Sequence, residues 1–163
     1  MSDPTDDMAR CAVAIAAALA AADPGEKAEA RRMDEGGAPV FWRQAARLDL
    51  PRRQESGWML FTRLVAILTP ASARQTVHDA SRPLGAVLAE AGFSERRLAR
   101  LLAARSAARD AALERAIRMI ARTHPRLNVV DLARVIFGRD RNRLPRSYYQ
   151  HLDHAPTEET TDA

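Results

Sequence analysis

The chain has 163 residues, of which 47% are hydrophobic and 28% are charged. This length suits one domain with a core of its own, and the composition is typical of a globular rather than a disordered protein. Cys11 is the single cysteine, which excludes an intramolecular disulfide and gives no sign of an oxidising compartment. We therefore expect a cytoplasmic protein of one domain.

The apolar run from Cys11 to Ala22 is too short to span a bilayer. Asp3, Asp6 and Asp7 precede it, whereas a signal peptide begins with positive charge. We therefore expect no membrane segment and no membrane partner.

Proline and glycine divide the chain into segments of helical length. Aromatic residues make up only 5%, which leaves the core mainly to aliphatic side chains and favours helices over sheets. The polar stretch 71–81 is expected to be a loop or an irregular helix. The predicted fold is all-α, a single compact multi-helix domain, with helices at residues 7–22, 26–34, 39–48, 55–68, 83–91, 94–104, 107–123, 129–137 and 145–152.

Three of these segments carry apolar side chains at helical spacing, which predicts buried stripes. Gly92 is expected to end one helix and Ser94 to cap the next. Residues 1–7 are expected to be a flexible acidic end and residues 153–163, which carry four acids and no base, a disordered tail around a domain at 8–152. The predicted stripes are Trp58, Phe61, Val65 and Leu68; Leu98, Leu101 and Leu102; and Leu113, Ile117 and Ile120.

Positive charge is concentrated in the second half of the chain. The formal net charge is +4, yet residues 94–146 alone contain fourteen arginines and five acids. Two successive helices present arginines away from their apolar stripes, and a basic connection follows. These arginines are Arg96, Arg97 and Arg100, then Arg115, Arg118 and Arg122, then Arg139, Arg141 and Arg143.

A charged helix face is most often simply the solvated side of an amphipathic helix. Such a face usually mixes signs, however, and here arginines outnumber acids almost three to one over three successive elements. The pattern therefore favours a surface that binds phosphate.

Trp42, Trp58 and the adjacent Tyr148 and Tyr149 are expected mainly in the core or in interfaces, with at most one of the two tyrosines facing outward.

Residues typical of catalysis are sparse. Lys27 is the only lysine and follows no glycine-rich stretch, which excludes a phosphate-binding P-loop. His151 and His154 are the only closely spaced histidines and do not form a zinc motif. Ser147 and Asp153 lie near them without the strained turn that a catalytic triad requires. We expect no catalytic residue, no metal and no cofactor.

The order of four segments resembles the CasB family, the small subunit of the type I-E CRISPR Cascade complex. The resemblance covers about residues 8–152, and its most specific parts are the block from 83 to 105 and the final basic run into a double tyrosine. The four segments read ARRMDEGGAPVFWR (30–43), GWMLFTRLVAIL (57–68), PLGAVLAEAGFSERRLARLLAAR (83–105) and RNRLPRSYYQHL (141–152).

The resemblance implies two small packed helical bundles without enzymatic activity. It implies two copies lying head to tail, against the backbone subunits that hold the guide RNA and beside the large subunit. Such a subunit stabilises the R-loop by holding target DNA, above all the displaced strand. The contacts it implies are Arg32, Arg52, Arg97, Arg105, Arg118, Arg139, Arg141 and Arg143, of which Arg32 and Arg52 depend on the resemblance alone.

Two other functions remain open. A helix-turn-helix regulator would use the helix from Ser94 as support and the helix from Ala107 as reader, but the intervening turn lacks base-contacting polar residues. A protein-docking adaptor would direct the same arginines at an acidic partner. A small helical enzyme is disfavoured by the missing site residues.

Overall fold

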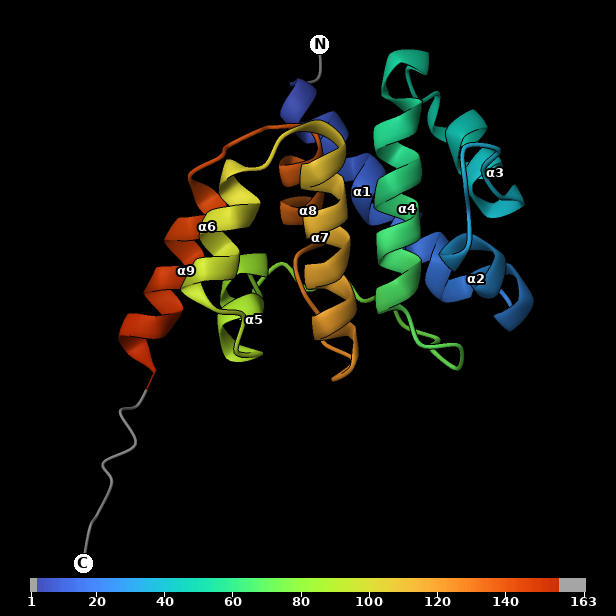
Figure 1. Cartoon of the computed structure of the whole chain (residues 1–163). Coiled ribbons are helices and arrows are strands. Elements are labelled where there is room, and N and C mark those ends of the chain that lie inside the picture. The colour runs from blue at the N-terminus through green and yellow to red at the C-terminus, as the bar shows by residue number, and fades with distance from the viewer. Residues whose placement is uncertain (1–2, 156–163) are drawn as a thin grey trace, which may run out of the picture.

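The computed structural model describes residues 3–155, and every regular element among them is helical apart from an isolated bridge between His78 and Leu127. The predicted all-α fold is confirmed for this part of the chain. In Figure 1, α7 and α8 lie between α4 on one side and α5, α6 and α9 on the other. The elements are α1 (Pro4–Ala21), α2 (Pro24–Arg31), α3 (Pro39–Leu48), the short 3₁₀ turn η1 (Arg52–Gln54), α4 (Glu55–Leu68), α5 (Leu84–Glu90), α6 (Glu95–Ala103), α7 (Ser106–Ala121), α8 (Val129–Ile136) and α9 (Arg143–His154).

One continuous cluster of buried side chains connects the helices from α1 to α9. The stripe predicted on α4 is buried from Trp58 to Leu68, and the stripe on α7 is fully buried. On α6, Leu98 and Leu101 are buried, but Leu102 is 39% exposed. The prediction that Leu102 belongs to the core is therefore wrong, because Leu102 lies at the edge of the apolar stripe, where its side chain lines an open hollow between α6 and the α8–α9 loop.

Local capping explains where several helices begin and end. The Ser94 hydroxyl accepts a hydrogen bond from the Arg97 amide at 3.2 Å, and Gly92 ends α5 with a φ of 81°, as predicted. α1 begins at Pro4 rather than at residue 7, because the Asp3 carboxylate accepts from the Thr5 amide at 2.9 Å.

The last helix is longer than predicted. It begins at Arg143 instead of residue 145 and continues through His154, so Asp153 and His154 are helical rather than part of a disordered tail. Pro145 is tolerated because it lies in the first turn, where its missing N–H has no partner within the helix. The rest of the predicted tail, residues 156–163, lies outside the described residues.

Helices α5 and α9 pack unusually closely at Gly85. A Cβ atom built there would lie 2.2 Å from the Ser147 hydroxyl and 2.3 Å from the Leu144 carbonyl oxygen. The buried Tyr148 hydroxyl donates a hydrogen bond to the Phe93 carbonyl, and burial raises the pKa of this phenol. Tyr149, in contrast, is 42% exposed, so only one of the two tyrosines faces outward, as predicted.

The start of the chain is tied to the end of α4 by two basic residues of α2. Lys27 is buried and donates from Nζ to the Ala73 carbonyl at 2.8 Å. Arg31 donates to the Ala66 and Thr69 carbonyls at 3.0 and 2.6 Å. Arg31 thus binds carbonyls at the C-terminal end of α4, where i+4 donors are missing, and Lys27 binds the loop that follows α4. In the described range, no helix combines the length and the apolarity that crossing a bilayer requires.

Candidate nucleic-acid interface

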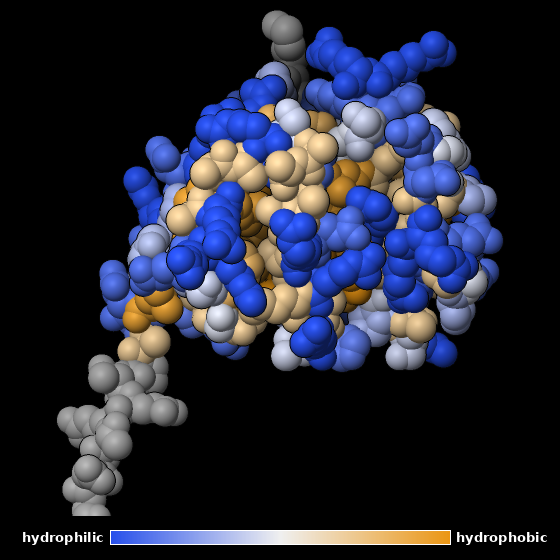
Figure 2. All heavy atoms as spheres, viewed as in Figure 1, coloured by the Kyte–Doolittle hydropathy of each residue, from blue (hydrophilic) through white to orange (hydrophobic). Residues whose placement is uncertain are grey.

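The predicted arginines lie at the surface. Eleven of the twelve are exposed, and Arg143 is half-buried. In Figure 2, hydrophilic residues cover the upper end of the molecule and form separate groups across its front face, with apolar residues between them. The exposed arginines are Arg32, Arg52, Arg96, Arg97, Arg100, Arg105, Arg115, Arg118, Arg122, Arg139 and Arg141.

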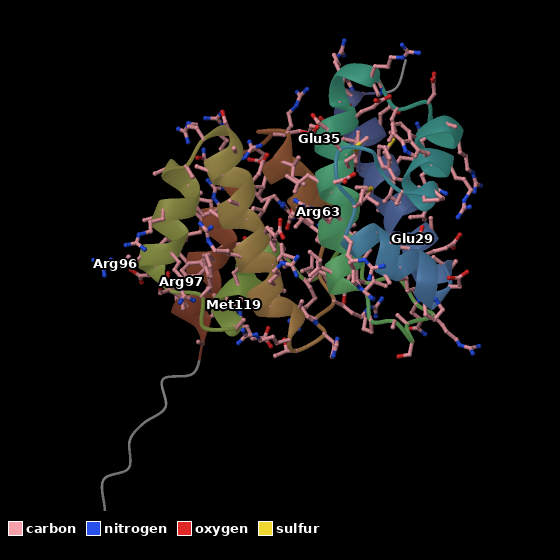
Figure 3. The ribbon with its side chains drawn as sticks, turned by 45° about the vertical axis from the view of Figure 1, so that its right-hand side comes forward. Glu29, Glu35, Arg63, Arg96, Arg97 and Met119 are labelled. Carbon is pink, nitrogen blue, oxygen red and sulfur yellow. The ribbon has the colours of Figure 1, made fainter. Side chains whose placement is uncertain are left out.

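The arginine row of α6 lies against α7 through Arg97. Its guanidinium Nη1 is 3.4 Å from the Met119 sulfur, and Figure 3 shows the two side chains side by side. Met119 lies four residues after Arg115 and three before Arg122, so this contact places Arg97 beside the face of α7 that carries these two arginines. The sequence predicts that two consecutive helices present arginine rows, and in the structure Arg97 of one row contacts the helix that carries the other.

Part of the charge on α7 is neutralised by Glu114. This carboxylate binds Arg118 on the same helix and Arg63 on α4, each at 2.9 Å. The Arg118 side chain remains 56% exposed, whereas the Glu114 side chain is only 23% exposed. Arg118 therefore still presents its guanidinium to solvent, with its charge partly balanced by a fixed acid.

A second concentration of charge surrounds a cavity of about 100 Å³ between the α6–α7 turn and the α8–α9 loop. Its walls include the apolar Leu101, Leu102, Val135 and Leu144. We call this cavity the arginine pocket, because six arginines line it: Arg105, Arg109, Arg134, Arg139, Arg141 and Arg143. Four of the six are among the arginines predicted from the sequence, all except Arg109 and Arg134.

Asp131 holds two of these arginines in place. Its side chain is 5% exposed and accepts hydrogen bonds from Arg134 at 2.8 Å and from Arg143. Arg134 lies three residues after Asp131 on α8, a spacing that brings two side chains together on one helix face. This spacing was the one sequence signal that could have identified Arg134. No sequence signal near Asp131 indicated that Arg143 would also bind this carboxylate.

The turn η1 approaches the same end of the molecule. Arg53 and Arg139 line one hollow together with the first turns of α1, whereas the predicted Arg52 does not line it. Arg32 is different. It lies on the α2–α3 connection in a shallow hollow that also contains Glu29 and Asp34. The structure therefore places Arg53, and not the predicted Arg52, with Arg139, and it leaves Arg32 apart, among acids.

No group of three or more histidine, cysteine, aspartate or glutamate side chains in residues 3–155 is arranged to hold a metal ion. The thiol of Cys11 is buried, and this burial raises its pKa, with Arg10 opposing the shift. A buried neutral thiol is a poor nucleophile. The described surface thus offers guanidinium groups as its main chemistry, which suits anion binding.

Comparisons of this chain with known proteins gave no match to a family model, to a curated protein or to a solved structure.

Proposed function

We propose that this protein is a non-catalytic nucleic-acid-binding subunit of a CRISPR RNA-guided surveillance complex, Cascade, in which it holds target DNA strands on its arginine surface. One observation gives this proposal its main support. Within residues 3–155, ten of the twelve predicted arginines form no ion pair, and only Arg118 and Arg143 do. A merely solvated face usually mixes charges of both signs, whereas unpaired guanidinium groups are available for phosphate.

The surface suits phosphate better than bases. Trp58 and Tyr148 are buried, which leaves Trp42 and Tyr149, each 42% exposed, as the large aromatic side chains at the described surface. Few aromatic side chains thus remain for base stacking. A displaced strand changes its sequence with every target, so a subunit that holds it gains by binding charge and not base edges.

A helix-turn-helix regulator is less well supported. Its reading helix would be α7, whose first turn exposes Ser106, Ala107 and Ala108. Alanine side chains cannot form the hydrogen bonds that distinguish one base pair from another. A protein-docking adaptor is the remaining alternative, in which the same arginines contact an acidic protein.

The decisive experiment measures binding of single-stranded and duplex DNA of several sequences over a range of salt concentrations. We expect little dependence on sequence and a steep fall in affinity with salt, because each neutralised phosphate releases about 0.7 to 0.9 counterions. A tight consensus site that survives high salt would instead support the regulator. Absence of DNA binding, with retained binding to acidic protein partners, would support the adaptor.

A further inference from the structure

The arginine pocket has more positive charge than its acids can balance. Six arginine residues line it, against two acidic residues, Asp131 and Asp140. Asp131 is already bonded to Arg134 and Arg143. Among the lining residues, only the exposed Asp140 is left to balance the charge of the other four arginines. The cavity therefore has a net positive charge, which attracts an anion.

Several of these guanidinium groups are held in place before any ligand binds. Arg105 donates to the carbonyls of Leu102 and Ala104, each at 3.0 Å, and Arg109 pairs with Asp110 at 3.0 Å. In the described chain these contacts use at most two nitrogen atoms of each group, and a guanidinium has five N–H donors. Donors therefore remain for a ligand, and little side-chain entropy is lost when it binds.

The size of the cavity limits what can enter. Its volume is about 100 Å³, roughly that of three molecules in liquid water. This space accepts one tetrahedral anion and is too small for a helix, a peptide loop or a duplex. The pocket also adjoins the surface of exposed predicted arginines, because Arg105, Arg139 and Arg141 line it and are themselves exposed.

We propose that the arginine pocket binds one dianionic phosphate monoester, the terminal phosphate of a single-stranded nucleic acid. A monoester has about −1.5 to −2 charges at pH 7 and three acceptor oxygens. An internal phosphodiester has a single charge, and the chain leaves it on both sides, which keeps it out of a small cavity. The proposal rests on the proposed function, since the arginine surface around the pocket would bind the rest of the strand.

Fluorescence anisotropy of short oligothymidylates tests this inference. Strands with a 5′-phosphate, a 3′-phosphate or only hydroxyl ends are compared, with the dye on the opposite end. We expect at least one phosphate end to tighten binding about tenfold at neutral pH, which is the effect of one charge-assisted hydrogen bond. The gain should shrink as the pH falls through about 6, where a phosphate monoester becomes a monoanion. Inorganic phosphate should remove the gain without displacing the hydroxyl-ended strand.

Two matched variants test whether the gain in affinity from a terminal phosphate depends on the arginine pocket. Leu102→Asp places a carboxylate on the pocket wall, whereas Ala103→Asp adds the same charge to the same helix at an exposed position that does not line the pocket. We expect Leu102→Asp to abolish the preference for a phosphate end and Ala103→Asp to preserve it. Circular dichroism of both variants checks the fold.

The possible results distinguish failure of the pocket proposal from failure of the proposed function. Equal affinities for phosphate-ended and hydroxyl-ended strands would overturn the pocket proposal while the proposed function stands. If inorganic phosphate or thymidine monophosphate binds at the pocket but a strand end adds nothing, the pocket takes free phosphate and the strand-end proposal is wrong. A third outcome is that the hydroxyl-ended strand does not bind, whereas a phosphate end confers binding that Leu102→Asp abolishes. In that case the pocket proposal stands, and the proposal that the exposed arginines hold the strand is wrong.

Discussion

The Asp131 carboxylate accepts a hydrogen bond from the Leu84 amide at 3.1 Å, across 47 residues of sequence. Leu84 is the first residue of α5, so this bond satisfies an amide that has no partner within the helix. The same carboxylate binds Arg134 on α8 and Arg143 on α9. One buried acid therefore joins three helices and also places two arginines of the pocket.

We expect Asp131→Asn to lower the free energy of unfolding by about 2 kcal/mol. Asparagine has one acceptor oxygen and an NH₂ group, so at least one of the three donors around it loses its partner. The two arginines also lose a nearby negative charge, although both are partly exposed, which limits the cost. Urea unfolding measures the change. Asp140→Asn is the control: it removes a carboxylate that is exposed in the same pocket, and we expect a change below about 0.5 kcal/mol.

Gly85 should be intolerant of any side chain. We expect Gly85→Ala to cost about 3 kcal/mol or more, because the new methyl group would overlap the Ser147 hydroxyl and the Leu144 carbonyl and would push α5 from α9. Gly92→Ala separates packing from backbone strain. Gly92 has a φ of 81° with open space around its Cβ position, so its substitution should cost only about 1 kcal/mol. Equal losses in thermal unfolding would contradict this account.

The features that could be predicted from the sequence are those with a local cause. The Ser94 cap and the Gly92 terminus each depend on residues a few positions away, and both were predicted correctly. The exposure of the arginine rows also followed from helical spacing. Boundaries set by less obvious capping, such as the early start of α1 after Asp3, were missed.

The pocket could not be predicted, because its walls come from distant parts of the chain. Leu102 matched the apolar spacing of α6, but only the packing of neighbouring helices decides which edge of the stripe stays exposed. Arg109 lay off the predicted rows and was not selected. Arg32 and Arg52 were predicted from the resemblance alone, and neither lines the arginine pocket or the hollow that contains Arg53 and Arg139.

His78 should make stability depend on pH. Its Nδ1 accepts a hydrogen bond from the Val129 amide at 3.2 Å, which requires the neutral ring. Burial lowers the pKa of His78 below 6.5; Asp79 and Asp131 oppose this shift and Arg126 adds to it. The unfolded chain therefore binds a proton more readily than the folded one, so the free energy of unfolding should fall as the pH drops below about 6.5.

Urea unfolding of the wild type and of His78→Asn between pH 8 and pH 5 measures this effect. Asparagine retains an acceptor for the Val129 amide but does not titrate. We expect the variant to lose less stability than the wild type over this range. Parallel pH profiles would show that the titration of His78 does not control stability.

Reversing charge at three positions distinguishes a phosphate-binding surface from a solvated one. Arg118→Ala or Arg141→Ala alone should weaken DNA binding modestly and lower the salt slope by about one unit, since each removes one phosphate contact. Replacing Arg97, Arg118 and Arg141 together with glutamate should abolish binding, because repulsion of phosphate is added to the lost attraction. The fold should persist. On α7 the substitution replaces the Arg118–Glu114 ion pair by a like-charged pair at the same spacing, and a like-charged pair of this kind costs only about 0.2 to 0.5 kcal/mol.

The matched control replaces Arg43, Arg47 and Arg74 with glutamate. It gives the same net charge from exposed positions on α3 and in the loop after α4, outside the arginine rows and the pocket. We expect this variant to retain most of its affinity for DNA in a mobility-shift assay. Equal losses in both triple variants would mean that only net charge matters and that no binding surface exists. A pull-down by the other subunits of the complex completes the test. If it fails for the first variant while circular dichroism shows an intact fold, Arg97, Arg118 and Arg141 contact protein, and the docking function is correct.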